Sequence, residues 1–169
     1  QQANTGLFSV GRIAEREPLF QWVGPFVSSQ NRFYTLKGSP LKINSLADAR
    51  QHKLVMPRLW YSVQYLQSQG FDDIYTVTSP EIMMNMFRNG RSDLLAASDV
   101  TLPNVLALAD LTPADVVPQF SFMEHSSYLV FSPATNPQVA LRWQKAFEQL
   151  RRDGTVARLQ SRWLGHIKP

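Results

Sequence analysis

The sequence predicts an α/β fold with mainly parallel sheets. Strand-like runs alternate along the chain with helical segments, and the longer helical segments have the ~10–15 residues typical of βαβ units. The composition, with 44% apolar and 18% charged residues, is that of a globular protein. A chain of 169 residues is about one domain by length and is long enough to bury a core.

Short runs rich in β-branched and aromatic residues, bounded by turn-forming residues, predict the strands. The apolar run at residues 20–27 is interrupted by Gly24-Pro25, so we expect no continuous strand there. Strands are expected at residues 7–10, 32–36, 54–56, 74–78, 93–97 and 128–131, and a strand or an extended connection at 115–122.

Capping residues mark where helices begin. Ser45 precedes one helix and Asp48 follows three residues later, which is the spacing of a capping box. Ser79 and Pro80 supply an N-cap and a first-turn proline for another helix. We expect helices at residues 46–52, 61–69, 80–89, 102–109 and 138–152, and a last one from 155 to about 165.

Apolar side chains recur at helical spacing on three of these helices. Such stripes are typical of helix faces that pack on a sheet, so we expect them in the core rather than at a ligand. The stripes are Ile82, Met83, Met86 and Phe87; Trp143, Phe147 and Leu150; and Val156, Leu159 and Trp163.

The net charge of +4 comes from one end of the chain. Residues 1–123 balance, whereas residues 124–169 carry seven basic and three acidic residues. A basic segment favours nucleic acid or an anionic membrane as partner. Here the spacing of the basic residues favours the solvated faces of helices instead.

Several chemistries are excluded or disfavoured. The chain has no cysteine, which excludes disulfides, thiolate metal sites and a cysteine nucleophile. His52, His125 and His166 lie far apart in sequence, without the spacing of metal ligands. No GxGxxG, GxxxxGK[ST] or GxSxG motif occurs, and no apolar run approaches the ~18 residues of a membrane span. The first residues show no signal peptide, as in a mature secreted chain or a trimmed one.

Residues 9–17 concentrate charge immediately after a predicted strand. Either this is a solvated loop with weak local Arg–Glu pairs, or it is an anion clamp. An arginine fork binds a carboxylate through two hydrogen bonds, and a helix start after a strand adds free backbone amides. Both interpretations remain open from local chemistry.

Five segments of the chain form a recognisable series. They are 9–25 (SVGRIAEREPLFQWVGP), 43–48 (INSLAD), 54–71, 89–94 (NGRSDL) and 150–165, with LRRDGT, Trp163 and Gly165. In this order they resemble the type II periplasmic solute-binding proteins, and specifically the family 3 proteins that bind polar amino acids for ABC transporters. The similarity spans roughly residues 6–165.

The resemblance implies two α/β lobes joined by crossing strands near residues 26–30 and 122–127, closing on a ligand like a hinge. Lobe 2 is then 29–123, and lobe 1 is 1–28 with 124–169. It implies a periplasmic, non-enzymatic subunit of an ABC importer without a cofactor or metal. The expected partners are an amino acid or related small carboxylate and the membrane permease, and no nucleic acid.

The family's ligand-binding residues carry over unevenly. Arg16 falls where the family places the arginine that binds the substrate α-carboxylate. Ser9 and Gly11 fall on the adjacent ligand-contacting segment, and Arg12 supplies a second positive charge.

In the second lobe the sequence departs from the family. Arg58-Leu59-Trp60 stands at the turn where the family has a Gly-Ser/Thr pair, and the amino-group-binding Asp falls near Ser98, with Asp99 one residue away. These departures favour a larger, aromatic or more acidic ligand.

The aromatic pair Trp60 and Tyr61 follows that turn. The two side chains either stack on the ligand or on a cation, or they pack as ordinary core.

A second departure concerns the first lobe. The family has two βα units before the strand at Ser9, and only eight residues precede it here. We therefore expect lobe 1 to be incomplete, because the chain is a fragment, because that part is lost or disordered, or because another chain supplies it. An uncovered apolar edge predicts a dimer through lobe 1.

Two other functions use the same fold in relatives. One is the ligand-sensing domain of a signalling receptor. The other, less favoured, is a dehydratase-like enzyme, for which Glu15 and Glu17 are the nearby acid or base candidates.

Overall fold

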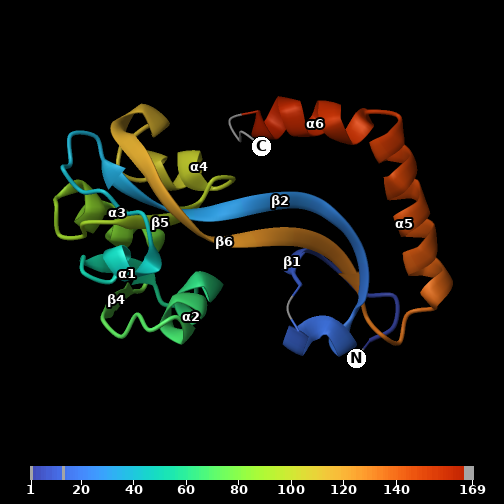
Figure 1. Ribbon diagram of the computed structural model, residues 1–169. Coiled ribbons are helices and arrows are strands. Elements are labelled where there is room, and N and C mark those ends of the chain that lie inside the picture. Colours follow the sequence, from blue (N-terminus) through green and yellow to red (C-terminus); the bar gives the residue numbers. More distant parts are fainter. Residues whose placement is uncertain (1, 13, 166–169) are drawn as a thin grey trace. The chain divides into compact units, whose positions relative to one another are not determined.

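The computed structural model describes residues 2–12 and 14–165, with the backbone alone at 14 and 15. Figure 1 shows the elements in chain order. The helices are α1 (Leu46–Ala49), α2 (Tyr61–Ser68), α3 (Pro80–Arg88), α4 (Leu102–Ala107), α5 (Pro137–Arg152) and α6 (Thr155–Leu164), with 3-10 helices η1 (Ala14–Leu19) and η2 (Pro113–Asp115). The strands are β1 (Gly6–Gly11), β2 (Gln21–Leu36), β3 (Leu54–Pro57), β4 (Ile74–Val77), β5 (Leu95–Ser98) and β6 (Val116–Phe131).

The chain divides into two compact units. Unit 1 comprises residues 1–29 and 125–169, and unit 2 comprises residues 30–124. The lobe boundaries expected from the sequence lie one residue earlier at each crossing. Two long strands, β2 and β6, run through both units.

The apolar pattern predicted these long strands as separate pieces, which was wrong. The family resemblance implied strands that cross near residues 26–30 and 122–127, and β2 and β6 do continue through both stretches. Their middle residues are mostly polar, so the apolar alternation that indicates a strand fades there. Backbone pairing does not depend on that alternation. In unit 1 the hydroxyls of Ser28 and Ser126, one on each strand, lie 2.9 Å apart and share a hydrogen bond.

The fold is α/β, as predicted. Strands β3 and β4 pair in parallel, and Leu54 forms a parallel bridge to Leu94, just before β5. The four-stranded sheet has the order β1-β6-β2-β5, in which β1 pairs antiparallel with β6 and β2 pairs antiparallel with β5.

The predicted caps position the helices of unit 2. The Ser45 hydroxyl accepts a hydrogen bond from the amide of Asp48 at 3.1 Å, and the Asp48 carboxylate accepts one from the amide of Asn44 at 2.9 Å. The Ser79 hydroxyl accepts from the amide of Ile82 at 3.5 Å, so both caps form.

Unit 2 has a well-filled core on both faces of its strands. Neighbouring residues of one strand, such as Phe33 and Tyr34, belong to two different apolar clusters, because successive side chains point to opposite faces. Met83 and Phe87 of α3 are about 1% exposed in one cluster, as the stripe predicted, whereas Ile82 of the same stripe is 44% exposed.

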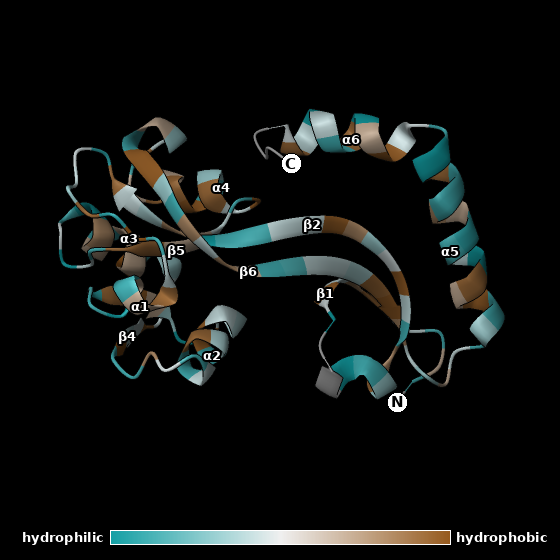
Figure 2. Ribbon diagram, viewed as in Figure 1, coloured by the Kyte–Doolittle hydropathy of each residue, from teal (hydrophilic) through white to brown (hydrophobic). Residues whose placement is uncertain are grey.

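Unit 1 has a much smaller core. Its apolar cluster contains four buried residues, Val23, Leu129, Phe131 and Ala140, against thirteen and eleven in the clusters of unit 2. Figure 2 shows apolar bands along α5 and α6.

The prediction that the stripes of α5 and α6 are buried was therefore wrong for most of their residues, although Phe147 is buried and Val156 is half-buried. Helical spacing places side chains on one face, but burial also needs a layer opposite that face, which the described residues do not supply. The exposed members are Trp143, Leu150, Leu159 and Trp163.

Candidate functional site

The candidate site of unit 2 lies where its parallel strands end. Strands β3 and β5 belong to different sheets, but the parallel bridge between Leu54 and Leu94 aligns them in the same direction, so Pro57 and Ser98 lie at corresponding ends of the two strands. In open α/β sheets ligands bind beyond the carboxyl ends of the strands. We call residues 58–61 and 98–99, with Asn31, the unit 2 edge.

Arg58 is the cationic group of this edge. Its amide donates to the carbonyl oxygen of Val77 at 3.0 Å, which fixes the turn after β3. Its side chain is exposed and makes no hydrogen bond or ion pair with the described residues. Leu59 beside it is 90% exposed. Among the described residues, the turn therefore presents an unpaired guanidinium beside an exposed leucine.

Trp60 and Tyr61 connect this turn to α2. Trp60 is half-buried and packs against both apolar clusters of unit 2, and its side chain does not cap the helix. The Tyr61 hydroxyl accepts a hydrogen bond from Nδ2 of Asn31 at 2.9 Å, and burial raises the pKa of Tyr61. Asn31 is 4% exposed, so this bond anchors the start of α2 to β2.

Asp99 supplies the carboxylate of the edge. Its Oδ1 accepts from the amide of Gln30 at 3.1 Å, and its own amide donates to the carbonyl oxygen of Gln30 at 3.0 Å. Burial and then the charge of Asp99 raise the pKa of Tyr34 to about 12, against the opposing charge of Arg32. The hydroxyl of Ser98 instead accepts from the amide of Val100 at 3.2 Å.

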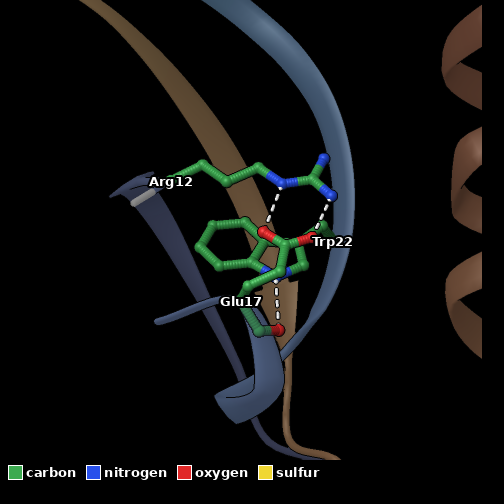
Figure 3. A network of polar contacts seen from close by, with 3 residues as sticks. All are labelled: Arg12, Glu17 and Trp22. Carbon is green, nitrogen blue, oxygen red and sulfur yellow. Dashed lines mark hydrogen bonds and ion pairs between the residues drawn. The ribbon is translucent and has the colours of Figure 1, made fainter. Parts of the chain in front are cut away.

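In unit 1, the Arg12 fork is already occupied. Its Nε donates to the Glu17 carboxylate at 2.8 Å, and Nη2 donates to the other carboxylate oxygen (Figure 3). The guanidinium carbon also lies 5.3 Å from the ring centroid of Trp22 and 5.4 Å from that of Tyr128. The bond to Glu17 raises the pKa of Arg12 and lowers that of Glu17. Of the two interpretations of residues 9–17, a local Arg–Glu pair or an anion clamp, the structure therefore shows the local pair for Arg12 and Glu17.

Arg16 is the free cation of the same segment. It lies exposed on η1 and makes no hydrogen bond or ion pair with the described residues. Burial and the charge of Arg16 lower the pKa of His125. Gly11 lies against the same histidine, and a Cβ at Gly11 would overlap its ring. Ser9 is exposed with φ of 58°.

The structure thus assigns the sequence-predicted residues to two separate groups. Arg58, Leu59, Trp60, Ser98 and Asp99 share the edge of unit 2, whereas Ser9, Gly11, Arg12 and Arg16 belong to unit 1. Sequence reasoning missed Asn31 and Gln30, which hold Tyr61 and Asp99 in place. They lie in a polar stretch without any motif.

The described residues contain no group of three His, Asp or Glu side chains placed to hold a metal ion. None of their helices combines the length and apolarity that a membrane span requires.

Known proteins match this chain in structure but not in the comparisons of sequence. No protein-family model matches the sequence, and no curated protein matches it. A histidine kinase sensor domain similar to periplasmic binding proteins aligns with a TM-score of 0.78 at 18% identity, covering 97% of this chain and 71% of the other.

Two further solved structures agree. The probable amino-acid ABC transporter extracellular-binding protein ytmK from Bacillus subtilis aligns with a TM-score of 0.76 at 16% identity, covering 93% of this chain and 69% of that one. The GluR0 ligand-binding core from Nostoc punctiforme, in complex with (L)-glutamate, gives 0.71 at 18%, with 92% and 70% covered.

The chain has the fold of the type II periplasmic binding proteins. The resemblance inferred from the sequence is confirmed at that level. These periplasmic-binding-protein neighbours are longer than this chain, which spans 66–71% of most of their lengths. The unit 2 edge and the segment 9–17 remain the two ligand-contacting regions expected from the sequence.

Proposed function

We propose that this protein is the periplasmic solute-binding subunit of an ABC importer, and that it binds an amino acid or a related small carboxylate. The fold supports this proposal, together with neighbours described as an extracellular-binding protein of a transporter and as a core holding (L)-glutamate. The membrane permease is the partner that receives the ligand.

The chemistry of the unit 2 edge carries the proposal. An unpaired guanidinium at Arg58 and a carboxylate at Asp99 follow the corresponding ends of β3 and β5, with the partly exposed ring of Tyr61 nearby in sequence. Opposite charges of this kind suit a zwitterion, because arginine binds a carboxylate and aspartate accepts from an ammonium group. Arg16 supplies a second carboxylate-binding group in unit 1.

Binding proceeds without turnover. General acid–base catalysis needs a side chain that is free to exchange a proton with the substrate. Of the two candidates from the sequence, Glu17 accepts hydrogen bonds from Nε and Nη2 of Arg12, and the side chain of Glu15 lies outside the described residues. Chemically unchanged ligand recovered after prolonged incubation is the expected result.

Isothermal titration against a panel of amino acids and small carboxylates tests the proposal. We expect selective binding that weakens at least tenfold in Arg58→Ala and Asp99→Asn, since each removes one charge-assisted contact. Arg91→Ala is the matched control, because Arg91 is another exposed arginine of unit 2 that precedes β5. Absence of binding to every compound, or equal loss in Arg91→Ala, contradicts the proposal.

A sensor is the second candidate function. A histidine kinase sensor domain is among the structural neighbours, and it covers 97% of this chain. Deleting the gene distinguishes the importer from the sensor. Loss of ligand uptake supports the importer, whereas normal uptake with loss of the transcriptional response to the ligand supports the sensor.

A further inference from the structure

A pocket in unit 2 lies at the end of its strands that is opposite to the unit 2 edge. Two turns form it, residues 50–53 before β3 and residues 70–73 before β4. Strands β3 and β4 pair in parallel from Leu54 and Ile74 onward, so both turns lie at the amino-terminal ends of their strands. The pocket is therefore separate from residues 58–61, which follow the carboxyl end of β3. Its volume of about 200 Å³ is many times the ~10–15 Å³ that one water molecule needs, so it admits a small molecule.

The end of helix α2 fixes the second of these turns. The amide of Phe71 donates to the carbonyl oxygen of Leu66 at 3.1 Å, and the amide of Gly70 donates to that of Gln67 at 3.0 Å. These bonds form a Schellman motif, in which Gly70 takes the left-handed conformation with φ of 83°. Phe71 is 4% exposed and belongs to the same apolar cluster as Leu66. The backbone that carries the next two residues into the pocket is thus held in place.

Side chains of opposite charge line this pocket without being paired. Arg50 contributes a guanidinium, and Asp72 and Asp73 contribute two carboxylates. Within the part of the chain that the structure describes, none of these three side chains makes a hydrogen bond or an ion pair. All three residues are exposed, so a ligand can reach their charged groups.

An aromatic ring orients the Arg50 side chain at the pocket. The guanidinium carbon of Arg50 lies 5.9 Å from the ring centroid of Phe71, and 3.8 Å from the position that a Cβ on Gly70 would take. A guanidinium that lies over a ring keeps its N–H groups free for a carboxylate. The buried side chain of Leu54 and the half-buried ring of His52 complete the lining.

We propose that this pocket is a second ligand site, which binds an amino acid with a basic side chain. The Arg50 fork matches the α-carboxylate, and the carboxylates of Asp72 and Asp73 match the two ammonium groups. One guanidinium and two carboxylates leave one negative charge, which the single net positive charge of a basic amino acid complements. This site goes beyond the ligand site proposed at the unit 2 edge and does not depend on it.

Other small occupants match the lining less well. A metal ion needs converging ligands, and the described residues include no group of three His, Asp or Glu side chains placed to hold one. A phosphate or a simple carboxylate would face two carboxylates of the same charge. A diamine would leave the Arg50 guanidinium without an anion.

Amide chemical shifts of isotope-labelled protein, recorded during titration with L-lysine, test the site. We expect saturable shifts at residues 50–54 and 70–74. Norleucine lacks the side-chain ammonium group and cadaverine lacks the α-carboxylate, so both are expected to bind about tenfold more weakly at these amides. Absence of saturable shifts there with lysine, or equal binding of norleucine or cadaverine, overturns the proposal.

Two variants test the charges of the pocket separately. Arg50→Gln and the double variant Asp72→Asn/Asp73→Asn are each expected to weaken lysine binding about tenfold. Arg151→Gln is the matched control, because Arg151 on α5 is also exposed and its side chain has no partner among the described residues. Unchanged affinity in a folded pocket variant, or an equal loss in Arg151→Gln, overturns the proposal.

The same titration separates this site from the one proposed at the unit 2 edge. Shifts at residues 58–61 and 98–99 report on the edge, whereas shifts at residues 50–54 and 70–74 report on the pocket. Shifts confined to the edge overturn the second site and leave the proposed function standing. If Arg50→Gln fails to fold, the double variant, which changes only exposed side chains, decides the outcome.

Discussion

At the residue scale, charged side chains differ in whether they are satisfied within the chain. Arg12 donates twice to Glu17 and lies near two aromatic rings, so a ligand has to compete with an intramolecular carboxylate for it. Arg58 and Arg16 have no such partner among the described residues. An arginine whose guanidinium already binds a carboxylate of the chain has a structural role, whereas an arginine without such a partner is available to a ligand. This difference does not follow from the position of the arginine in the sequence.

The Arg12–Glu17 pair predicts a pH-dependent contribution to stability. The pKa of Glu17 is lowered in the folded protein, so the pair stabilises the fold above the ordinary glutamate pKa of about 4.5. That contribution is lost as the pH falls through the lowered pKa. Urea unfolding of wild type and Glu17→Gln is expected to differ at pH 7 and to converge in acid. A difference that persists unchanged at low pH contradicts this account.

The contact between Gly11 and His125 predicts that substitutions at these two positions have non-additive effects on stability. A Cβ at Gly11 overlaps the half-buried imidazole, so Gly11→Ala has to displace the ring from its rotamer and is expected to destabilise the protein by about 1 kcal/mol. Removing the ring in Gly11→Ala/His125→Ala makes room for the methyl group. A double-mutant cycle from denaturant unfolding should therefore give a favourable coupling energy, and simple additivity would argue against the close contact.

At the element scale, the helices of the two units differ in what they face. In unit 2, α3 places Met83 and Phe87 in a filled cluster. In unit 1, α6 has no buried residue, although Leu159 and Trp163 share its apolar stripe. The same amphipathic pattern thus gives a core helix in one unit and an uncovered face in the other.

Helix α3 allows a buried and an exposed member of one apolar stripe to be compared. Phe87→Ala is expected to cost about 3–5 kcal/mol, because Phe87 is 1% exposed and truncation leaves a cavity. Ile82→Ala on the same helix is expected to change stability by only about 0.5 kcal/mol, because Ile82 is 44% exposed. Denaturant unfolding measures both, and equal costs would contradict the observed packing.

At the scale of the whole molecule, the unequal cores predict unequal local stability. Amides open locally where few apolar contacts hold an element. Hydrogen exchange measured by mass spectrometry is therefore expected to be faster for residues 155–164 than for residues 80–88. Equal protection of these two helices would show that α6 is held by contacts that its exposed face does not reveal.

The sequence by itself determined the α/β class, most helices and the likeness to the type II periplasmic binding proteins. These follow from local signals: caps such as Ser79, apolar periodicity on α3, and a charged segment after a strand. Each signal lies within a few residues, where backbone preferences act.

Only the tertiary structure decided which side chains are free and which faces are covered. It joined the pieces of β2 and β6 into continuous strands, paired Arg12 with Glu17, and brought Asn31 to Tyr61, 30 residues away. It also left Trp163 exposed, although its stripe predicts burial. The physical reason is that burial and pairing depend on partners distant in sequence, which no local pattern encodes.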